Sequence, residues 1–497
     1  QIPKQIDMLS SYEYMIMKNE ARVNDGQAPQ YADNSLDSIS NELNINWQDV
    51  VYRNALSQDH QITFTGKDQK YSYLLSGNYS DQQSVIKKAG YTRGGVRLNY
   101  ERQITPKLTV GLKTYLSLAD RKFGLQSNWT GILGSTVVLG ALSFNPLQNP
   151  YDPETGDFDE NLANGPLLLI EKVTDQTSIR TVLSNFNADY KFNKNLTYTL
   201  KAGINEIYSL RNVYYPTGTF IGNSAPGGSA TRADTRNANY VIDNLLTYKK
   251  VFAKKHSVNA VAGYSYQRWF NNSTSVTNLG FPSNTLTYKN PAGASFPGRT
   301  FYNLTERALM SFLSRANYSY DKRYLLTLTG RYDGSTRLSP GNKWNLYPSV
   351  GLGWNASNED FFKENISFLS LLKLRASIGV AGNDNIRVGG SQASYSLNYY
   401  PFGQNINPNY VVSDFDNPNL RWESTRQFNL GLDLVVGDNF NITTNYFIKN
   451  TKDLLFQPEV SAVLGTNGPG GQSPIVNAGD VSNQGIELEL AYYPDRQ

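Results

Sequence analysis

Alternation of apolar and polar residues runs through most of this chain, and it is clearest between residues 325 and 380. Near the end of that stretch, apolar side chains occupy every second position, at Leu372, Leu374, Ala376, Ile378 and Val380. Lysine, arginine, serine and glycine fill the positions between them. Because successive side chains of a β-strand point to opposite faces, this pattern predicts a strand with one apolar and one polar face.

The connections between the predicted strands alternate between short and long. Short turns are predicted near residues 67–70, 103–107, 193–195, 249–256, 321–323, 357–366 and 437–439. Long loops fall between them, notably at 121–177, 209–235, 270–303 and 382–424. Outer-membrane barrels have short turns on the periplasmic side and longer loops outside, whereas a soluble sandwich mixes loop lengths at both ends. We therefore predict an all-β fold, a large antiparallel transmembrane β-barrel with about 15 strands of roughly 9–14 residues.

Composition removes several classes of protein. No run of about 18 apolar residues occurs, so transmembrane helices are not expected. The 46 basic residues nearly balance the 42 acidic ones, and no basic stripe indicates a nucleic-acid partner. The chain has no cysteine, which excludes disulfides, thiolate metal sites and thiolate nucleophiles.

The chain divides into two predicted parts. Residues 1–60 contain two helix candidates, at 8–23 and 44–56, and form a connecting region before the main run of strands. Residues 61–497 form the barrel strands with their long loops. Because the chain begins at Gln1 and stops directly after a strand-like run, we expect an internal segment of a longer protein.

Aromatic residues gather beside the short turns predicted at 321–323 and 357–366. They are Tyr318, Tyr320, Tyr324, Trp354, Phe361 and Phe362. Aromatic side chains form girdles where barrels meet the membrane interface. We interpret this group as a periplasmic girdle, the alternative being the core of a soluble sheet.

Catalytic and metal chemistry find little support in the sequence. Only two histidines occur, His60 and His256, both in predicted turn regions, and neither a G-x-S-x-G nor an H-E-x-x-H motif is present. An acidic turn carries Asp152, Asp157, Asp159 and Glu160. Clustered carboxylates can bind Ca²⁺, but this spacing does not match an EF-hand, so a solvated loop is the simpler interpretation. We predict no catalytic residue, no metal and no cofactor, and hence no enzyme.

Candidate ligand contacts are aromatic residues in the predicted long loops, since flat apolar faces with polar rims suit sugar rings. They are Trp129, Tyr214, Tyr215, Trp269, Tyr399, Tyr400 and Tyr410. Two charged residues of the hairpin at 330–343, Arg331 and Asp333, join the candidates. Together with Arg337 and Lys343 they either pin that hairpin or form a polar surface above the barrel lumen.

Several segments resemble one known family. They include IPKQIDMLSSYEYMIMKNEA, GRYDGSTRL followed by YPSVGLGWNASNEDFF, LRWESTRQFNLGLDL and NAGDVSNQGIELEL. The chain is similar in these segments, and in their order, to the SusC/RagA-like TonB-dependent transporters of Bacteroidetes. The resemblance implies a parent protein with an N-terminal plug inside a barrel of about 22 strands.

The resemblance also implies a function and partners. A SusC/RagA-like protein imports oligosaccharides, or oligopeptides, across the outer membrane together with a SusD-like surface lipoprotein that acts as a lid. Energy would come from the TonB complex acting through the N-terminal region, and the transporter–lipoprotein pairs could form a dimer. The partners expected are thus that lipoprotein, the TonB complex, the cargo and outer-membrane lipid. The alternatives are a passive porin-like channel and a soluble β-rich glycan-binding protein.

Overall fold

The computed structural model describes residues 5–122, 137–156, 159, 165–223, 227–285, 287–366, 368–437, 439–459, 461, 463 and 473–494. Fifteen strands of the described residues form one antiparallel sheet in which each strand pairs with the next along the chain, apart from two small hairpins that lie outside it. The strands are β1 Ser57–Lys67, β2 Tyr71–Gln83, β3 Gly90–Thr105, β4 Leu108–Lys122, β5 Thr174–Lys191, β6 Leu196–Tyr215, β7 Ser229–Phe252, β8 His256–Leu279, β9 Phe296–Tyr320, β10 Tyr324–Ser335, β11 Trp344–Asn355, β12 Leu369–Asn383, β15 Glu423–Val436, β16 Phe440–Lys452 and β19 Val481–Tyr492.

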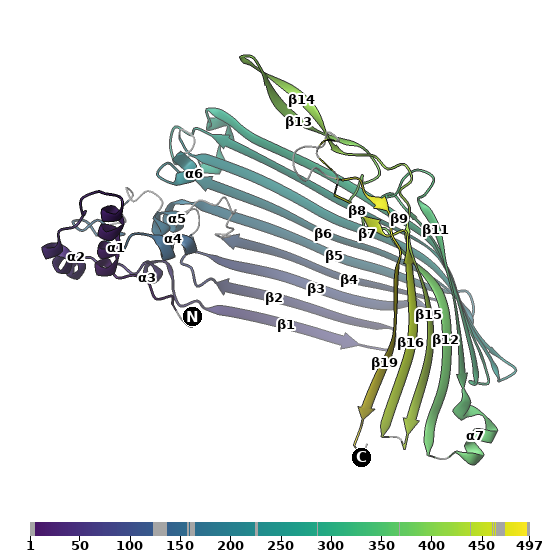
Figure 1. The fold of residues 1–497 in the computed structure, drawn as a ribbon. Coiled ribbons are helices and arrows are strands. Elements are labelled where there is room, and N and C mark those ends of the chain that lie inside the picture. Colours follow the sequence, from purple (N-terminus) through teal and green to yellow (C-terminus); the bar gives the residue numbers. More distant parts are fainter. Residues whose placement is uncertain are drawn as a thin grey trace.

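The sheet is strongly curved, and β1 and β19 lie at the two ends of its strand order (Figure 1). The remaining strands are β13 Ser394–Phe402 with β14 Asn405–Asp414, and β17 Leu455–Phe456 with β18 Val476–Asn477. The predicted all-β sheet of about 15 strands is confirmed, and so are the seven predicted short turns, which all lie between paired neighbours.

Two predicted loops are wrong because the strands there are longer than expected. Strands β6–β9 contain 20, 24, 24 and 25 residues, so the connections shrink from 209–235 to 216–228 and from 270–303 to 280–295. In β8 the added strand residues 270–279 are mostly Asn, Ser and Thr, which alternate polar with polar and therefore give no apolar period. Their backbone groups nevertheless pair in an unbroken register from Ser229 with Leu279 to Phe252 with His256.

The two faces of the sheet differ in polarity, as the alternation predicts. One face is apolar and open, with Leu352, Ile486, Leu488 and Leu490 each more than half exposed. We call it the apolar face. The other, the polar face, carries residues of the opposite parity, such as Lys373 next to Asp433 across the β12–β15 pair.

Short helices stand at both ends of the sheet (Figure 1). Helices α1 Ser11–Asn24, α2 Leu36–Glu42, α3 Trp47–Val51, α4 Val137–Ser143 and α5 Pro166–Lys172 lie at the long-connection end, and so does α6 Phe220–Asn223, whereas α7 Asp360–Asn365 lies at the short-turn end. The helix α1 begins at a capping box, in which Ser10 and Glu13 satisfy each other's backbone N–H groups. Residues from α3, α4, α5 and the β2–β3 connection bury a common core around Trp47 and Val51.

The division into a connecting region at 1–60 and a barrel at 61–497 stays a prediction. The helices α1–α3 fall in the first part, and β1 begins at Ser57 rather than after residue 60. No helix among the described residues combines the length and the apolar character that crossing a membrane requires.

The six aromatic residues predicted as a girdle all lie at the short-turn end, and one of them is buried. Four of the six residues have the parity of the apolar face, namely Tyr318, Tyr320, Tyr324 and Trp354. Phe362 instead is 2% exposed, because the short helix α7 turns its ring inward.

Candidate functional site

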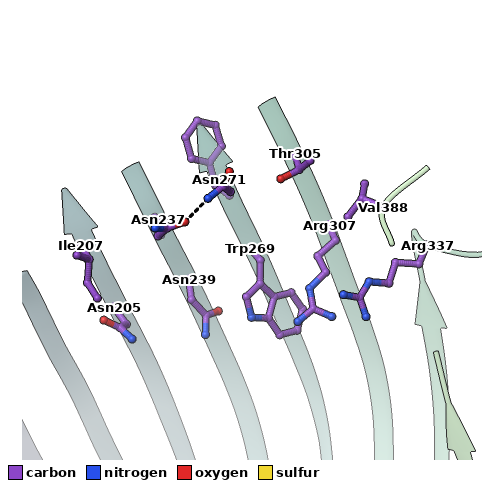
Figure 2. Close-up of a pocket in the computed structure, with 12 residues that line it drawn as sticks. Asn205, Ile207, Asn237, Asn239, Trp269, Asn271, Thr305, Arg307, Arg337 and Val388 are labelled. Atoms are coloured by element: carbon purple, nitrogen blue, oxygen red, sulfur yellow. Dashed lines mark hydrogen bonds between the residues drawn. The ribbon is translucent and has the colours of Figure 1, made fainter. Parts of the chain in front are cut away.

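A cavity of about 310 Å³ opens on the polar face close to the middle of β6–β9 (Figure 2). This volume is at the lower end of ligand pockets, which run from about 300 to 1,000 Å³. Side chains from four adjacent strands and two connections line it, chiefly Asn205, Ile207, Asn237, Asn239, Trp269, Asn271, Thr305, Arg307, Arg337 and Val388.

Strand register brings the two largest of these side chains together. Trp269 on β8 lies opposite Arg307 on β9, and both have the parity of the polar face. The guanidinium carbon of Arg307 lies 3.7 Å from the centre of the Trp269 ring (Figure 2). A guanidinium stacked on an aromatic face directs its N–H groups sideways, within the guanidinium's own plane, so they stay available for hydrogen bonds.

Asparagine side chains form the other wall of the cavity. Asn237 and Asn271 are bonded to each other across the β7–β8 pair. Gln267 donates a hydrogen bond to the amide oxygen of Asn239 at 3.1 Å. The wall thus offers neutral donors and acceptors beside the Trp269–Arg307 stack.

Arg337 enters from the connection between β10 and β11, and a small core holds that connection in place. Leu338, Leu420 and Trp422 pack together there, and Ser339 donates to the Leu420 carbonyl at 2.6 Å. The guanidinium of Arg337 lies 3.8 Å from the Asp384 carboxylate and donates to the Asp384 carbonyl at 3.2 Å. Asp384 also accepts from Ser335 at 2.7 Å, so the carboxylate nearest to the cavity already has partners.

Ion pairs on the apolar face lie level with the cavity and show where it stands relative to the apolar band. Arg268, the residue before Trp269, pairs with Glu306 at 2.6 Å, and Arg236 pairs with Glu206 at 2.8 Å. From His256 at the short-turn end to Arg268 the strand rises about 28 Å along the barrel axis, if each residue adds about 3.3 Å at a tilt of about 45°. Because that rise matches the apolar band of a membrane barrel, the cavity lies at the band's long-connection edge.

A model of one protein family, described as "TonB dependent receptor-like, beta-barrel", matches residues 128–495. This chain belongs to the TonB-dependent receptor-like β-barrel family. It is 30% identical over 461 residues to the TonB-dependent receptor P3 of Formosa agariphila, which covers 91% of this chain and 45% of that protein. It is 27% identical over 527 residues to the TonB-dependent receptor SusC of Bacteroides thetaiotaomicron, covering 99% of this chain and 49% of SusC.

Solved structures agree on the fold. The RagAB peptide transporter superposes with a TM-score of 0.76 at 22% identity, over 99% of this chain and 57% of that chain. The chain thus spans about half the length of the curated relatives it matches. These likenesses confirm the resemblance to SusC/RagA-like proteins. Proteins of this kind are outer-membrane transporters, so the apolar face of this TonB-dependent receptor barrel contacts lipid and its polar face lines the lumen.

A second charged group lies on the same lumenal face of the receptor barrel. Arg375 on β12 donates to both oxygens of Asp433 on β15, at 3.0 Å each for the shortest contacts, and to Asn445 on β16 at 2.6 Å. Gly431 leaves room for that guanidinium, since a Cβ there would lie 2.7 Å from its central carbon. This network joins three strands and uses the hydrogen-bonding groups of its arginine internally.

The predicted pair Arg331 and Asp333 proves to be internal too. Both lie within β10 and not in the turn that follows it. Arg331 donates to Asp333 at 3.0 Å and to Ser311 on β9 at 3.0 Å, and Asp333 is 8% exposed. The arrangement favours the pinning role that the sequence offered as one of two interpretations.

Three predicted loop aromatics lie in strands, which corrects their placement. Trp269 is ten residues inside the end of β8 and contributes to the cavity. Tyr214 and Tyr215 close β6, and Tyr214 is 1% exposed because its ring packs edge-on against Phe281 and its hydroxyl donates to Asn284 at 3.0 Å. A ligand therefore has no access to the Tyr214 ring.

The other three described candidates occupy the β13–β14 hairpin, which projects from the rim of the receptor barrel (Figure 1). Tyr399, Tyr400 and Tyr410 are 62%, 59% and 72% exposed. They lie away from the cavity, whose lining includes none of them. Trp129 falls outside the described residues.

The groups considered for metal or catalysis are dispersed. Asp152 accepts from the backbone N–H groups of Glu154 and Thr155 and so caps its own turn, whereas Asp157 and Glu160 fall outside the described residues. His60 lies inside β1 and not in a turn, and His256 opens β8, where its ring nitrogen contacts the Tyr318 hydroxyl at 2.7 Å. The described residues include no group of three or more side chains suited to a metal ion.

The sequence interpretation missed the asparagines and Arg307. A signal was present, because Asn237 and Asn239 alternate on one face of a strand. It was not used, because the candidates were chosen among aromatic and charged residues.

Proposed function

We propose that this chain supplies most of the barrel of an importer that carries oligosaccharides across the outer membrane. Oligopeptides are the second choice of cargo. Its membership of the TonB-dependent receptor barrel family carries the proposal. By the resemblance to SusC/RagA-like proteins, the TonB complex delivers energy from the inner membrane through a plug domain. No covalent step is needed, because selectivity rests on binding in a closed cavity.

The lumenal cavity at Trp269 is the proposed contact with cargo. It combines an aromatic ring with several side-chain amides at the outer edge of the lipid-facing band. Sugar hydroxyls both donate and accept hydrogen bonds, as amide groups do, and their ring faces suit aromatic surfaces. These properties support an oligosaccharide cargo over an oligopeptide.

The β13–β14 hairpin is the proposed contact with a SusD-like lipoprotein lid. Its register collects apolar residues on one side, and Tyr395, Leu397, Ile406 and Tyr410 there are 64%, 51%, 72% and 72% exposed. The other side is mixed, with asparagines at 405, 407 and 409 beside Tyr400 and Phe402. A two-stranded hairpin is marginally stable alone, so an apolar side of this kind supports a partner protein.

Purification of the full-length transporter from native outer membrane in mild detergent tests this proposal. We expect a SusD-like lipoprotein to co-purify. The double substitution Ile406→Ser with Tyr410→Ser should release it, whereas the matched double substitution Asn407→Ser with Asn409→Ser, on the other side of the same hairpin, should retain it. A dimer of transporter–lipoprotein pairs would appear in the same preparation as twice the mass of one pair.

A porin-like channel is the competing function. A protein that purifies alone and passes small solutes in cells with a collapsed proton gradient would contradict the proposed importer. Cargo uptake that stops when the gradient collapses would support it.

A further inference from the structure

The cavity on β6–β9 has an unequal charge balance. Two arginines, Arg307 and Arg337, belong to its lining, which contains no carboxylate. Arg337 is engaged by Asp384. Among the described residues no carboxylate forms an ion pair with Arg307, whose guanidinium stacks on Trp269. The cavity therefore has an excess positive charge at a fixed position.

We propose that Arg307 forms an anion-binding subsite that selects an oligosaccharide bearing a carboxylate or a sulfate group. The inference rests on the proposed import function and narrows its cargo to acidic glycans. A guanidinium matches the two oxygens of such a group with parallel N–H donors, and charge-assisted bonds of this type are the strongest available to a side chain. The indole holds the guanidinium in place from its face and leaves those donors free.

The surroundings of Arg307 favour an acidic sugar over an acidic peptide. Peptides bind to sheets mainly by adding a strand at a free edge. Here both edges of β8 are already paired with neighbouring strands along the cavity. Trp269 lies opposite Asn239 of β7 on one side and opposite Arg307 of β9 on the other. Recognition at this place thus uses side chains only, and the amides of Asn237 and Asn239 suit hydroxyl groups that surround an acidic substituent.

The test compares acidic ligands with one another and with a neutral ester of the same sugar. Full-length transporter in detergent is titrated calorimetrically with tetragalacturonate, its methyl ester, a sulfated heparin tetrasaccharide and tetraglutamate. We expect at least one of the two acidic glycans to bind about 10- to 100-fold more tightly than the methyl ester, and binding to weaken as salt is raised. Tight binding of tetragalacturonate shows that a carboxylate is sufficient, whereas tight binding of the heparin tetrasaccharide alone shows that sulfate is required.

Three substitutions assign the preference to its residue. Arg307→Gln should remove it, and Arg307→Lys should retain only part because an ammonium has neither the planar fork nor the same stacking. Arg315→Gln is the matched control, since Arg315 lies on the same strand and face but closer to the short-turn end. It should leave the preference unchanged.

Each other outcome overturns the subsite. Failure of both acidic glycans to bind, equal binding of the ester, a preference for tetraglutamate, or a preference that survives Arg307→Gln would do so. An Arg307→Gln protein with a lowered unfolding temperature and unchanged ligand binding would show that Arg307 serves another part of the parent protein. Lipoprotein content is scored in the same preparations, so loss of the lid, which contradicts the proposed function, is told apart from loss of the anion preference.

Discussion

Two arginines on the lumenal face of this barrel lie on similar strands but differ in their partners. Arg375 lies in a closed network with Asp433 and Asn445 that ties β12, β15 and β16 together. Arg307 lies on β9 against the Trp269 ring, with no acidic partner among the described residues. The residue type and the face are the same, so the function of each arginine is set by what its neighbours already satisfy.

The difference follows from the residues on adjacent strands. Opposite Arg375, glycine at 431 opens space and Asp433 two positions away offers a carboxylate. Around Arg307 the register supplies an indole and amides instead. A charge satisfied within the sheet contributes to stability, whereas a charge left unsatisfied is available to a ligand.

The largest expected effect separates the two arginines by stability. Arg375→Ala should lower the free energy of unfolding by about 1–3 kcal/mol, because Asp433 loses a bidentate partner in a partly buried position. Arg307→Ala should cost less than about 1 kcal/mol, since only the stacking contact is lost. Thermal unfolding of the full-length protein in detergent measures both, and equal losses would break the comparison.

A smaller effect is expected from the glycine that accommodates Arg375. In Gly431→Ala the new methyl group would lie 2.7 Å from the guanidinium carbon, which forces the side chain away from Asp433. We expect a loss of about 1–2 kcal/mol. The control is Gly351→Ala on the same face, where the nearest atoms lie at 3.8 Å, and it should change stability by less than about 0.5 kcal/mol.

The indole at the ligand site gives a further contrast. Trp269→Leu should weaken binding of an acidic oligosaccharide about 3- to 10-fold, because Arg307 loses the surface that orients it. The same change should leave stability nearly as it is, in contrast to any substitution in the Arg375 network. Calorimetric titration beside an unfolding curve checks both parts, and unchanged affinity would show that the stack has no role in binding.

The smallest effect is expected for Glu359, a hydrogen-bonded carboxylate that lies outside the strands at the short-turn end. Trp354 donates to Glu359 at 3.1 Å and Arg323 donates at 2.7 Å, and these bonds, that from Trp354 above all, lower the pKa of Glu359. A lowered pKa stabilises the fold above the unfolded-state pKa of the carboxyl, and this contribution is lost as pH falls through the folded-state value. Glu359→Gln should therefore flatten the acid side of the unfolding profile. An unchanged profile would assign the acid sensitivity to other groups.

The sequence predicted the sheet well and the site poorly, for a physical reason. Apolar alternation such as Leu372 to Val380 arises from contact with lipid, so it predicts strands only inside the membrane band. Beyond that band both faces of β7 and β8 are largely polar, and the outer parts of these strands fell within the predicted loops 209–235 and 270–303. The pairing that makes these segments strands is set by neighbouring chain segments and leaves no local signal.

For the candidate residues, the sequence indicated the chemistry of each side chain but not its surroundings. Trp269 was named for its chemistry and does line the cavity, although β8 continues ten residues beyond it. Arg331 and Asp333 were named for their charge, yet each satisfies the other. Which charged residue is left unsatisfied depends on strand register, and this explains why Arg307 could not be selected from the sequence.

The most direct test of the account is an electron cryo-microscopy map of the full-length transporter with its co-purified lipoprotein and a saturating acidic oligosaccharide. The account predicts sugar density in the lumen, with an anionic group against the Arg307 guanidinium and hydroxyls near Asn239. A carboxylate of the transporter itself bonded to Arg307, with sugar density elsewhere or absent, would contradict it.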